Sequence, residues 1–301
     1  MPTRRRNHLL LLPILLLLST SQALADRPGW NEPGRAPGYN QDGLLRINTN
    51  YFNMAAATGG DFYYWAPGEF AASAGLFNVP IASEPIVLAY ASEGGTFRQV
   101  QDIPVDGTIS QLSLFAGAQR LDRFRLFRPD GRSVDENPAG VTVQSFRFMR
   151  IVTVVDPEPG VWRVEMSGEG SFELAARYLA ERRRLQQLGL KGIDLIDFSF
   201  VELRGRPGHQ GLFALKETPP TGTRQRCRMT LTGGVEPLAV ELVSDRGYVI
   251  GQVELEPQPE LPADEFIGSC LVPDQPFRVR VTGKGPQDWT FQRVTSGLLA
   301  P

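Results

Sequence analysis

Short segments in which apolar and polar residues alternate constrain the fold of this chain more than any other feature. They recur through residues 99–180 and again through residues 192–301, and most of them end at a turn rich in glycine or proline. Val161–Met166 and Phe277–Thr282 are clear examples. A period of two residues is typical of a β-strand with one buried and one wet face. Short strands bounded by turns predict an antiparallel β-sandwich.

The pattern predicts an all-β fold with two antiparallel β-sandwich domains, the second of them immunoglobulin-like, joined by a short helix. The residues around Glu181–Arg184 contain strong helix formers and no proline, which favours a helix there. The predicted organisation is a signal peptide (1–25), an irregular or mixed region with an aromatic strand (26–98), a first sandwich (99–180), a helical connector (181–191) and a second, immunoglobulin-like sandwich (192–301).

The start of the chain reads as a cleaved secretory signal peptide. Arg4–Arg6 give it a positive beginning, Leu9–Leu18 form an apolar run that contains a proline, and Ala23–Ala25 fit the small-residue cleavage rule. The apolar run is too short to cross a bilayer, which takes about 20 residues. We therefore expect a secreted or periplasmic protein with no membrane span in the mature chain.

Cysteine and histidine usage limits the chemistry. The only two cysteines are Cys227 and Cys270, and in an exported protein such a pair most simply forms a disulfide. A reduced buried pair is the alternative, whereas metal binding would need further ligands. Of two histidines, His8 leaves with the signal peptide and His209 lies in a turn-rich loop. No GxSxG motif accompanies it, so a serine hydrolase site is not expected.

Two groups of residues are candidate ligand contacts. Tyr63, Tyr64 and Trp65 lie in a short aromatic segment, residues 61–65, that is predicted to be a strand and could stack on a sugar. Successive strand residues face opposite sides, so about half of these rings are expected in the core. Asp130 and Asp135 share one loop and are a weak calcium candidate, although their spacing is not that of an EF-hand.

Other carboxylates support only an alternative reading as a carbohydrate-active enzyme. The pairs considered are Asp194 with Asp197 and Asp102 with Asp106. Residues three apart on a strand face opposite sides, so the first pair cannot converge from one regular strand. No phosphate-binding loop or dinucleotide fingerprint occurs, so no cofactor is expected. The formal net charge is −2, and no basic stripe suggests nucleic acid.

Beyond residue 99, a set of motifs resembles one known family over about two hundred residues, in order and in approximate spacing. The motifs are Ile103–Asp106, Pro129–Gly131, Val154–Trp162, Ile193–Phe200, Val281–Gly283 and Phe291–Val294. Together they resemble the β-sandwich region that follows the von Willebrand A domain in hemicentins and related extracellular matrix proteins. The DxSxS metal motif of that A domain is absent from the sequence, so metal-dependent adhesion is not carried over.

The resemblance implies two sandwiches and a non-catalytic role outside the cytosol. We therefore expect a binding or structural module, extracellular-matrix-like or adhesive in character, whose partner is a protein or a glycan. The alternatives are a carbohydrate-active enzyme that uses carboxylates, and an accessory subunit of an extracytoplasmic complex.

Overall fold

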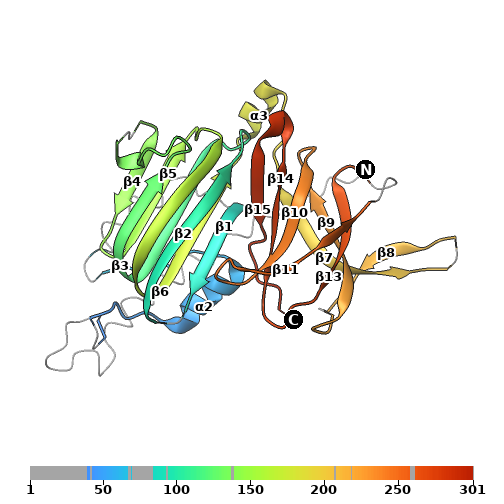
Figure 1. The fold of residues 1–301 in the computed structure, drawn as a ribbon, viewed down its shortest axis with the longest axis horizontal. Coiled ribbons are helices and arrows are strands. Elements are labelled where there is room, and N and C mark those ends of the chain that lie inside the picture. The colour runs from blue at the N-terminus through green and yellow to red at the C-terminus, as the bar shows by residue number, and fades with distance from the viewer. Residues whose placement is uncertain are drawn as a thin grey trace, which may run out of the picture. The chain divides into compact units, whose positions relative to one another are not determined.

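The computed structural model describes residues 39–40, 43–66, 69, 84–92, 94–136, 139–206, 208–217, 219–257 and 262–300. The predicted signal peptide lies outside these ranges. The chain divides into two compact units, Met1–Arg46 and Ile47–Pro301. In the first unit, Tyr39 and Leu45 form an antiparallel bridge. The second unit contains both β-sandwiches (Figure 1).

The second unit consists mainly of antiparallel strands, which confirms the all-β prediction. Its elements are α2 (Thr49–Thr58), β1 (Glu84–Ala91), β2 (Thr96–Val105), β3 (Gln111–Phe127), η2 (Val134–Glu136), β4 (Val141–Ser145), β5 (Met149–Val155), β6 (Gly160–Leu179), α3 (Arg182–Leu188), β7 (Leu195–Arg204), β8 (Gly211–Ala214), β9 (Arg224–Leu231), β10 (Glu236–Val243), β11 (Val249–Gln252), β12 (Glu254–Glu256), β13 (Glu265–Leu271), β14 (Arg278–Lys284), η3 (Pro286–Asp288) and β15 (Thr290–Val294). The short helix α3 lies between the two sandwiches in the chain, as predicted.

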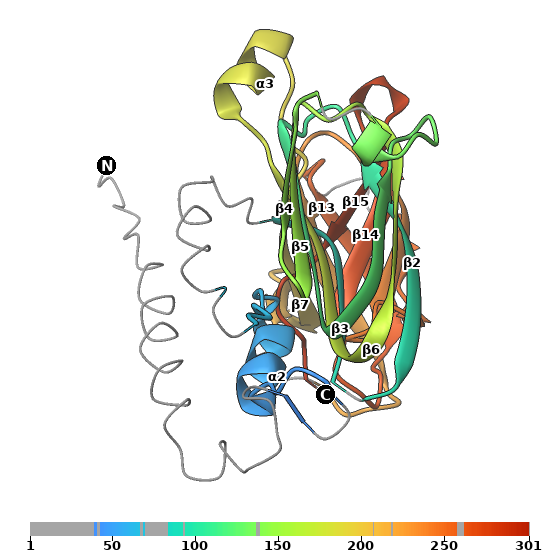
Figure 2. The same ribbon diagram turned by 90° about the vertical axis from the view of Figure 1, so that its left-hand side faces the viewer.

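One six-stranded sheet folds over on itself to make the first sandwich. Its order is β1-β6-β3-β5-β4, and β2 also pairs with β6. The first half of the long strand β6 pairs with β2, while its second half pairs with β1. Register shifts in β3 between Ala118 and Arg123 accompany the change from one layer to the other. Figure 2 shows the layer with β4 and β5 on one side and β2 on the other.

The core of the first sandwich lies between these two layers. Trp162 and Val164 from the first half of β6 belong to the same buried cluster as Leu174 and Ala176 from its second half. Alternation along β6 turns these residues inward and their neighbours outward. A long bent strand with a period of two therefore supplies side chains to both walls of one core.

The first sandwich begins earlier than the predicted boundary at residue 99. Residue 99 lies inside β2, and β1 (Glu84–Ala91) already pairs with β6 along most of its length. The apolar segment from Leu174 to Leu179, just before the predicted helical connector, is strand. Strand pairing decides this segment because Leu174 and Tyr178 fill the sandwich core.

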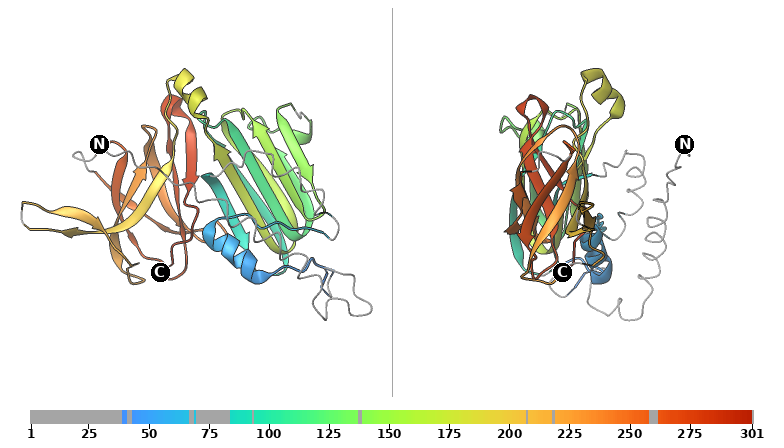
Figure 3. Two further views of the ribbon diagram at one scale, coloured as in Figure 1. Left: turned by 180° about the vertical axis from the view of Figure 1, so that it is seen from behind. Right: turned by 90° about the vertical axis from the view of Figure 1, so that its right-hand side faces the viewer.

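The second sandwich has the predicted immunoglobulin-like arrangement. One sheet has the order β12-β13-β9-β7-β8, and the other has the order β11-β10-β14-β15. This division of consecutive strands between two sheets is that of the immunoglobulin fold. A separate cluster, which includes Leu231, Leu242, Val281 and Phe291, fills the space between the sheets. Figure 3 shows the β7–β8 hairpin extending from this sandwich.

The two sandwiches are joined by hydrogen bonds as well as by α3. The side-chain amide of Gln292 on β15 donates to the carbonyl of Ile86 on β1 at 2.7 Å, and the amide of Tyr90 donates to the carbonyl of Asp245 at 2.9 Å. These contacts place β1 and β15 side by side within the second unit. Among the described residues, no helix combines the length and the apolar character that a membrane crossing requires.

The predicted disulfide is not formed in the structure. Cys227 on β9 is paired with Gly268, and Cys270 on β13 is paired with Gln225, so the cysteines are diagonal neighbours rather than directly opposite. Both are free and buried. Diagonal neighbours on adjacent strands have Cα atoms about 7–8 Å apart, beyond the usual disulfide range. A hydrogen bond to Cys270 and burial raise the pKa of the Cys227 thiol.

We expect both thiols to be present in the purified protein. Titration with Ellman's reagent should detect almost no thiol in the native protein, because Cys227 and Cys270 are only 1% and 2% exposed. After denaturation without reductant, both should react. A denatured sample with no reactive thiol would show that the two strands shift enough to form the bridge.

Candidate functional site

The first sandwich has two outer faces, and they differ in what covers them. One belongs to the layer with β1, the second half of β6, and β5, and the segment from α2 to Ala66 packs over it. The other belongs to β2, the first half of β6, and the second half of β3. We call the second one the open face, because Arg98, Asp102, Arg123 and Arg163 on it are exposed.

The covering segment was only partly foreseen from the sequence. Helix α2 was not predicted, although its ends carry recognisable signals: Asn48 caps the first turn, accepting from the amides of Asn50 and Tyr51, and Gly59 ends the helix with a φ of 71°. Residues 61–65, where a strand was predicted, form none. The amide of Phe62 donates to the carboxylate of Glu173 at 2.7 Å instead of to a neighbouring strand.

The predicted aromatic contacts separate into core and surface. Tyr64 is fully buried, and its ring lies so close to Gly117 that a Cβ there would be 2.3 Å from it. Tyr63 and Trp65 stack on each other with centroids 5.7 Å apart, and Tyr63 is 38% exposed. Tyr63 also meets Phe115 edge to face. The division between core and surface agrees with the alternation expected of these rings, but their packing leaves a sugar little free ring surface.

A buried polar cluster lies beneath the covering segment. Arg177 donates to Asp61 at 2.8 Å and to the carbonyl of Gly59, which fixes the segment to β6. Glu173 is fully buried beside them, and among the described residues its Oε1 has no hydrogen-bond partner. Burial, and then the neighbouring Asp61 carboxylate, raise the pKa of Glu173 well above its ordinary value. The cluster holds the segment in place and is closed to large ligands.

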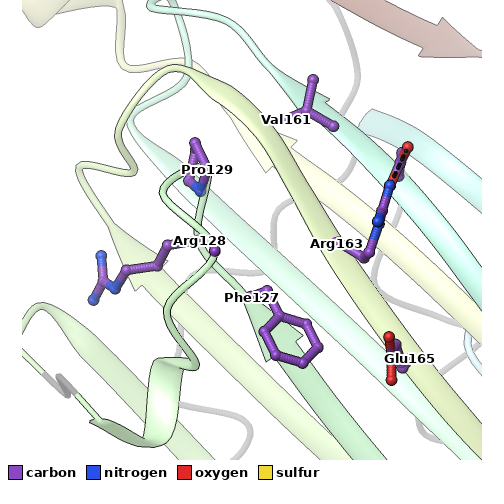
Figure 4. A pocket seen from close by; sticks show the side chains of 8 residues that line it. Phe127, Arg128, Pro129, Val161, Arg163 and Glu165 are labelled. Atoms are coloured by element: carbon purple, nitrogen blue, oxygen red, sulfur yellow. Dashed lines mark hydrogen bonds and ion pairs between the residues drawn. The ribbon is translucent and has the colours of Figure 1, made fainter.

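The open face carries a hollow of about 390 Å³. Figure 4 shows Arg163 between Val161 and Glu165 along β6, with Phe127 on the neighbouring strand β3. The residues that line it are Asp102, Phe127, Arg128, Pro129, Gly131, Val161, Arg163 and Glu165. Its volume lies at the lower end of the range typical of small-molecule sites, about 300–1,000 Å³.

The chemistry of the hollow suits a polar ligand with an apolar face. Arg163 donates to both oxygens of Asp102, at 2.7 and 3.0 Å, so its guanidinium is tied to the neighbouring strand β2. Phe127 lies directly opposite Arg163 on β3 and supplies an aromatic surface. Glu165 adds a carboxylate that can accept hydroxyl hydrogens. An aromatic ring beside fixed donors and acceptors is the combination that binds sugars and polar peptide side chains.

Four other residues considered from the sequence do not line this hollow: Asp130, Asp135, Asp194 and His209. Asp130 accepts from the backbone amide and the side chain of Arg132, which lowers its pKa, and Asp135 lies on η2. Within the described part of the chain, no three acidic, histidine or cysteine side chains converge as metal ligands. Asp194 accepts from the Tyr178 hydroxyl at 2.6 Å. His209 is exposed in the turn before β8.

The carboxylates of the enzyme alternative do not form a converging pair. Asp102 is engaged by Arg163 on the open face, whereas Asp106 is fully buried and paired with Arg293 at 2.9 Å. Asp197 is exposed on β7, past a register shift from Leu195. Of the residues that line the hollow, only Asp102 was considered from the sequence, and there as half of a carboxylate pair with Asp106. The sequence does show Arg125 and Phe127 alternating with apolar residues, which is typical of an outward-facing set on a strand. Only the strand register shows that Phe127 lies opposite Arg163.

A comparison with protein families matches part of the first sandwich. Residues 86–177 match the family model described as hemicentin galactose-binding domain-like, from β1 to near the end of β6. This confirms the similarity to the hemicentin β-sandwich region inferred from the motifs. No curated protein matches the chain. The crystal structure of Bacillus licheniformis lipase BlEst2 in propeptide form aligns with 75% of this chain and 48% of its own length, about half, at 11% identity and a TM-score of 0.28.

Proposed function

We propose that this protein is a non-catalytic binding module that works outside the cytosol and contacts a glycan or protein through the open face of its first sandwich. The hollow around Arg163 carries the proposal, because it lies within the segment similar to galactose-binding domain-like proteins. The signal-peptide pattern of residues 1–25 supports the location. The second sandwich, joined to the first through β1 and β15, serves as a rigid support.

A glycan array with the purified chain tests the proposal, because it screens many candidate ligands at once. We expect binding to at least one glycan, and we expect Phe127→Ala and Glu165→Gln each to weaken it about tenfold through the loss of a ring contact or an acceptor. Val143→Ala on β4 removes an exposed apolar side chain that does not line the hollow, and it should leave binding unchanged.

Two results would contradict the proposal. Release of sugar products that is lost in an aspartate or glutamate variant would make the protein an enzyme. Equal weakening by Val143→Ala and Phe127→Ala would place the ligand elsewhere. Thermal unfolding of each variant shows whether a loss of binding comes from misfolding, and Glu165→Gln provides a second variant with no change in core packing.

A further inference from the structure

Three side chains form a row across the open face. The row crosses β6 two residues beyond Glu165, which lines the hollow. Arg98 on β2 and Arg123 on β3 are both paired with Ser167 on β6, which lies between them. Residues directly opposite on neighbouring strands project to the same face. Both arginines are exposed. Two guanidinium groups therefore flank one hydroxyl on a surface that faces solvent.

A β-bulge in β3 turns Arg123 to this face. Leu121 is paired with Gly168 and packs toward the core, and the register then shifts before Arg123. In a regular strand, two residues with one between them share a face, so Arg123 would point inward with Leu121. The extra residue, Asp122, reverses the alternation. As a result, Arg123, Arg125 and Phe127 all point outward along one line.

The row also differs from its neighbours in having no internal counter-charge. In the next row on one side, Arg120 pairs with Glu169. The next row on the other side places Val100 and Arg125 opposite Glu165, and the row beyond it pairs Arg163 with Asp102. Among the described residues, neither the Arg98 side chain nor the Arg123 side chain makes a hydrogen bond or an ion pair. Arg120 is therefore held by an ion pair within the protein and Arg125 lies directly opposite a carboxylate, Glu165, whereas the two cations of this row lie opposite a neutral serine and remain available to a ligand.

We propose that the row formed by Arg98, Ser167 and Arg123 binds the carboxylate or sulfate group of an acidic polysaccharide. Adjacent strands lie about 4.8 Å apart, so the Cα atoms of the two arginines are about 10 Å apart, and both side chains can reach one anion above Ser167. Arginine presents forked donors that match the oxygens of carboxylate and sulfate groups. The serine hydroxyl adds a third donor.

A polymer of sugars fits this face better than a small anion does. The row and the hollow lie on the same three strands, with Arg163 four residues from Ser167 on β6, about 13 Å away. Phe127 and Glu165 there can meet a neutral sugar ring and its hydroxyls while the row holds an acidic group. This inference rests on the proposed function, since it names the ligand class of the same face.

Binding of defined polysaccharides to the full chain tests the inference. Probes would be oligogalacturonate for carboxylate, dextran sulfate for sulfate, and unmodified dextran as the neutral control. We expect one acidic probe to bind at low salt and to weaken as salt screens the charges. The double variant Arg98→Gln/Arg123→Gln should bind it about tenfold or more weakly, since two charge-assisted contacts are lost. Whichever acidic probe binds identifies the anion.

The matched control is Arg182→Gln/Arg183→Gln, which removes the same charge from exposed positions on α3. It should bind like the unchanged protein. Equal weakening by both double variants would show a non-specific charge effect and would overturn the inference. Failure of both acidic probes would overturn it as well. If a neutral glycan or a protein still bound and depended on Phe127, the proposed function would stand without this ligand class.

Discussion

Replacing Asp106 with alanine is expected to lower the free energy of unfolding by about 3–5 kcal/mol, because it leaves a buried charge without a partner. Arg293 is only 2% exposed at its side chain, and its guanidinium lies 2.9 Å from the Asp106 carboxylate. Asp106 also accepts from the amide of Thr108 at 3.0 Å. A single substitution therefore removes several interactions at one buried point.

The pair joins the two sandwiches, so the loss of Asp106 should affect more of the protein than its immediate surroundings. Asp106 follows β2 in the first sandwich, and Arg293 belongs to β15 in the second. The Arg293 guanidinium also lies 4.0 Å from the ring centroid of Tyr178 and donates to the carbonyl of Ile193 at 2.7 Å. Loss of Asp106 is thus expected to weaken the coupling of the two sandwiches, visible as a broader or two-step unfolding curve.

Urea denaturation followed by tryptophan fluorescence measures both effects. Asp102→Ala is the matched control, because it breaks an ion pair whose side chains are 48% and 54% exposed, and it should cost less than about 1 kcal/mol. The double variant Asp106→Leu/Arg293→Met should recover much of the lost stability, since it removes both charges. Similar small effects in Asp106→Ala and Asp102→Ala would contradict the structural role of the pair.

The architecture could be predicted because strand patterns are local. The alternation in Val161–Met166 and in β14 depends only on which residues face the core, and turns rich in glycine and proline separate the strands. The immunoglobulin-like arrangement of the second sandwich follows from the number and spacing of such strands. The position of the short helix α3 was also readable, although its exact start was not.

The junction and the binding face could not be predicted, because they depend on contacts between distant segments. Strand β15 reads as half wet, with Gln292 and Arg293 among its polar positions, yet Phe291–Val294 are all buried. One side of β15 faces its own core and the other faces β1, and the sequence does not reveal that second contact. The row of Arg98, Ser167 and Arg123 likewise requires a register that a β-bulge shifts by one residue.

Replacing Glu173 with glutamine is expected to raise the free energy of unfolding at neutral pH and to reduce its dependence on pH. Glu173 is completely buried, and its Oε1 has no hydrogen-bond partner among the described residues. Burial and the nearby Asp61 carboxylate raise its pKa in the folded protein. A neutral glutamine of the same shape avoids the cost of ionisation, and its carbonyl can still accept from the amide of Phe62.

The raised pKa fixes the direction of the pH dependence. Below the unfolded-state pKa of about 4.3 the carboxyl is protonated in both states and its effect on stability is fully favourable. Above that value the unfolded chain releases a proton that the folded protein retains, so the wild type should lose about 1.4 kcal/mol per pH unit until the pH passes the folded-state pKa. Asp61, Arg177, Tyr64 and Tyr90 surround the carboxyl, and Arg177 alone among them opposes the shift by its positive charge.

Chemical denaturation of the wild type and Glu173→Gln between pH 4 and pH 8 measures this difference, with the exposed Glu158→Gln as control. The two curves should nearly meet at pH 4 and diverge as the pH rises, with Glu173→Gln the more stable by more than about 1.4 kcal/mol at pH 7. Glu158→Gln should follow the wild type throughout. Parallel curves for wild type and Glu173→Gln would mean that Glu173 ionises freely in the folded protein. The covering segment would then have to open to water at this point, because an ionised carboxylate with one oxygen unpartnered is costly to keep buried.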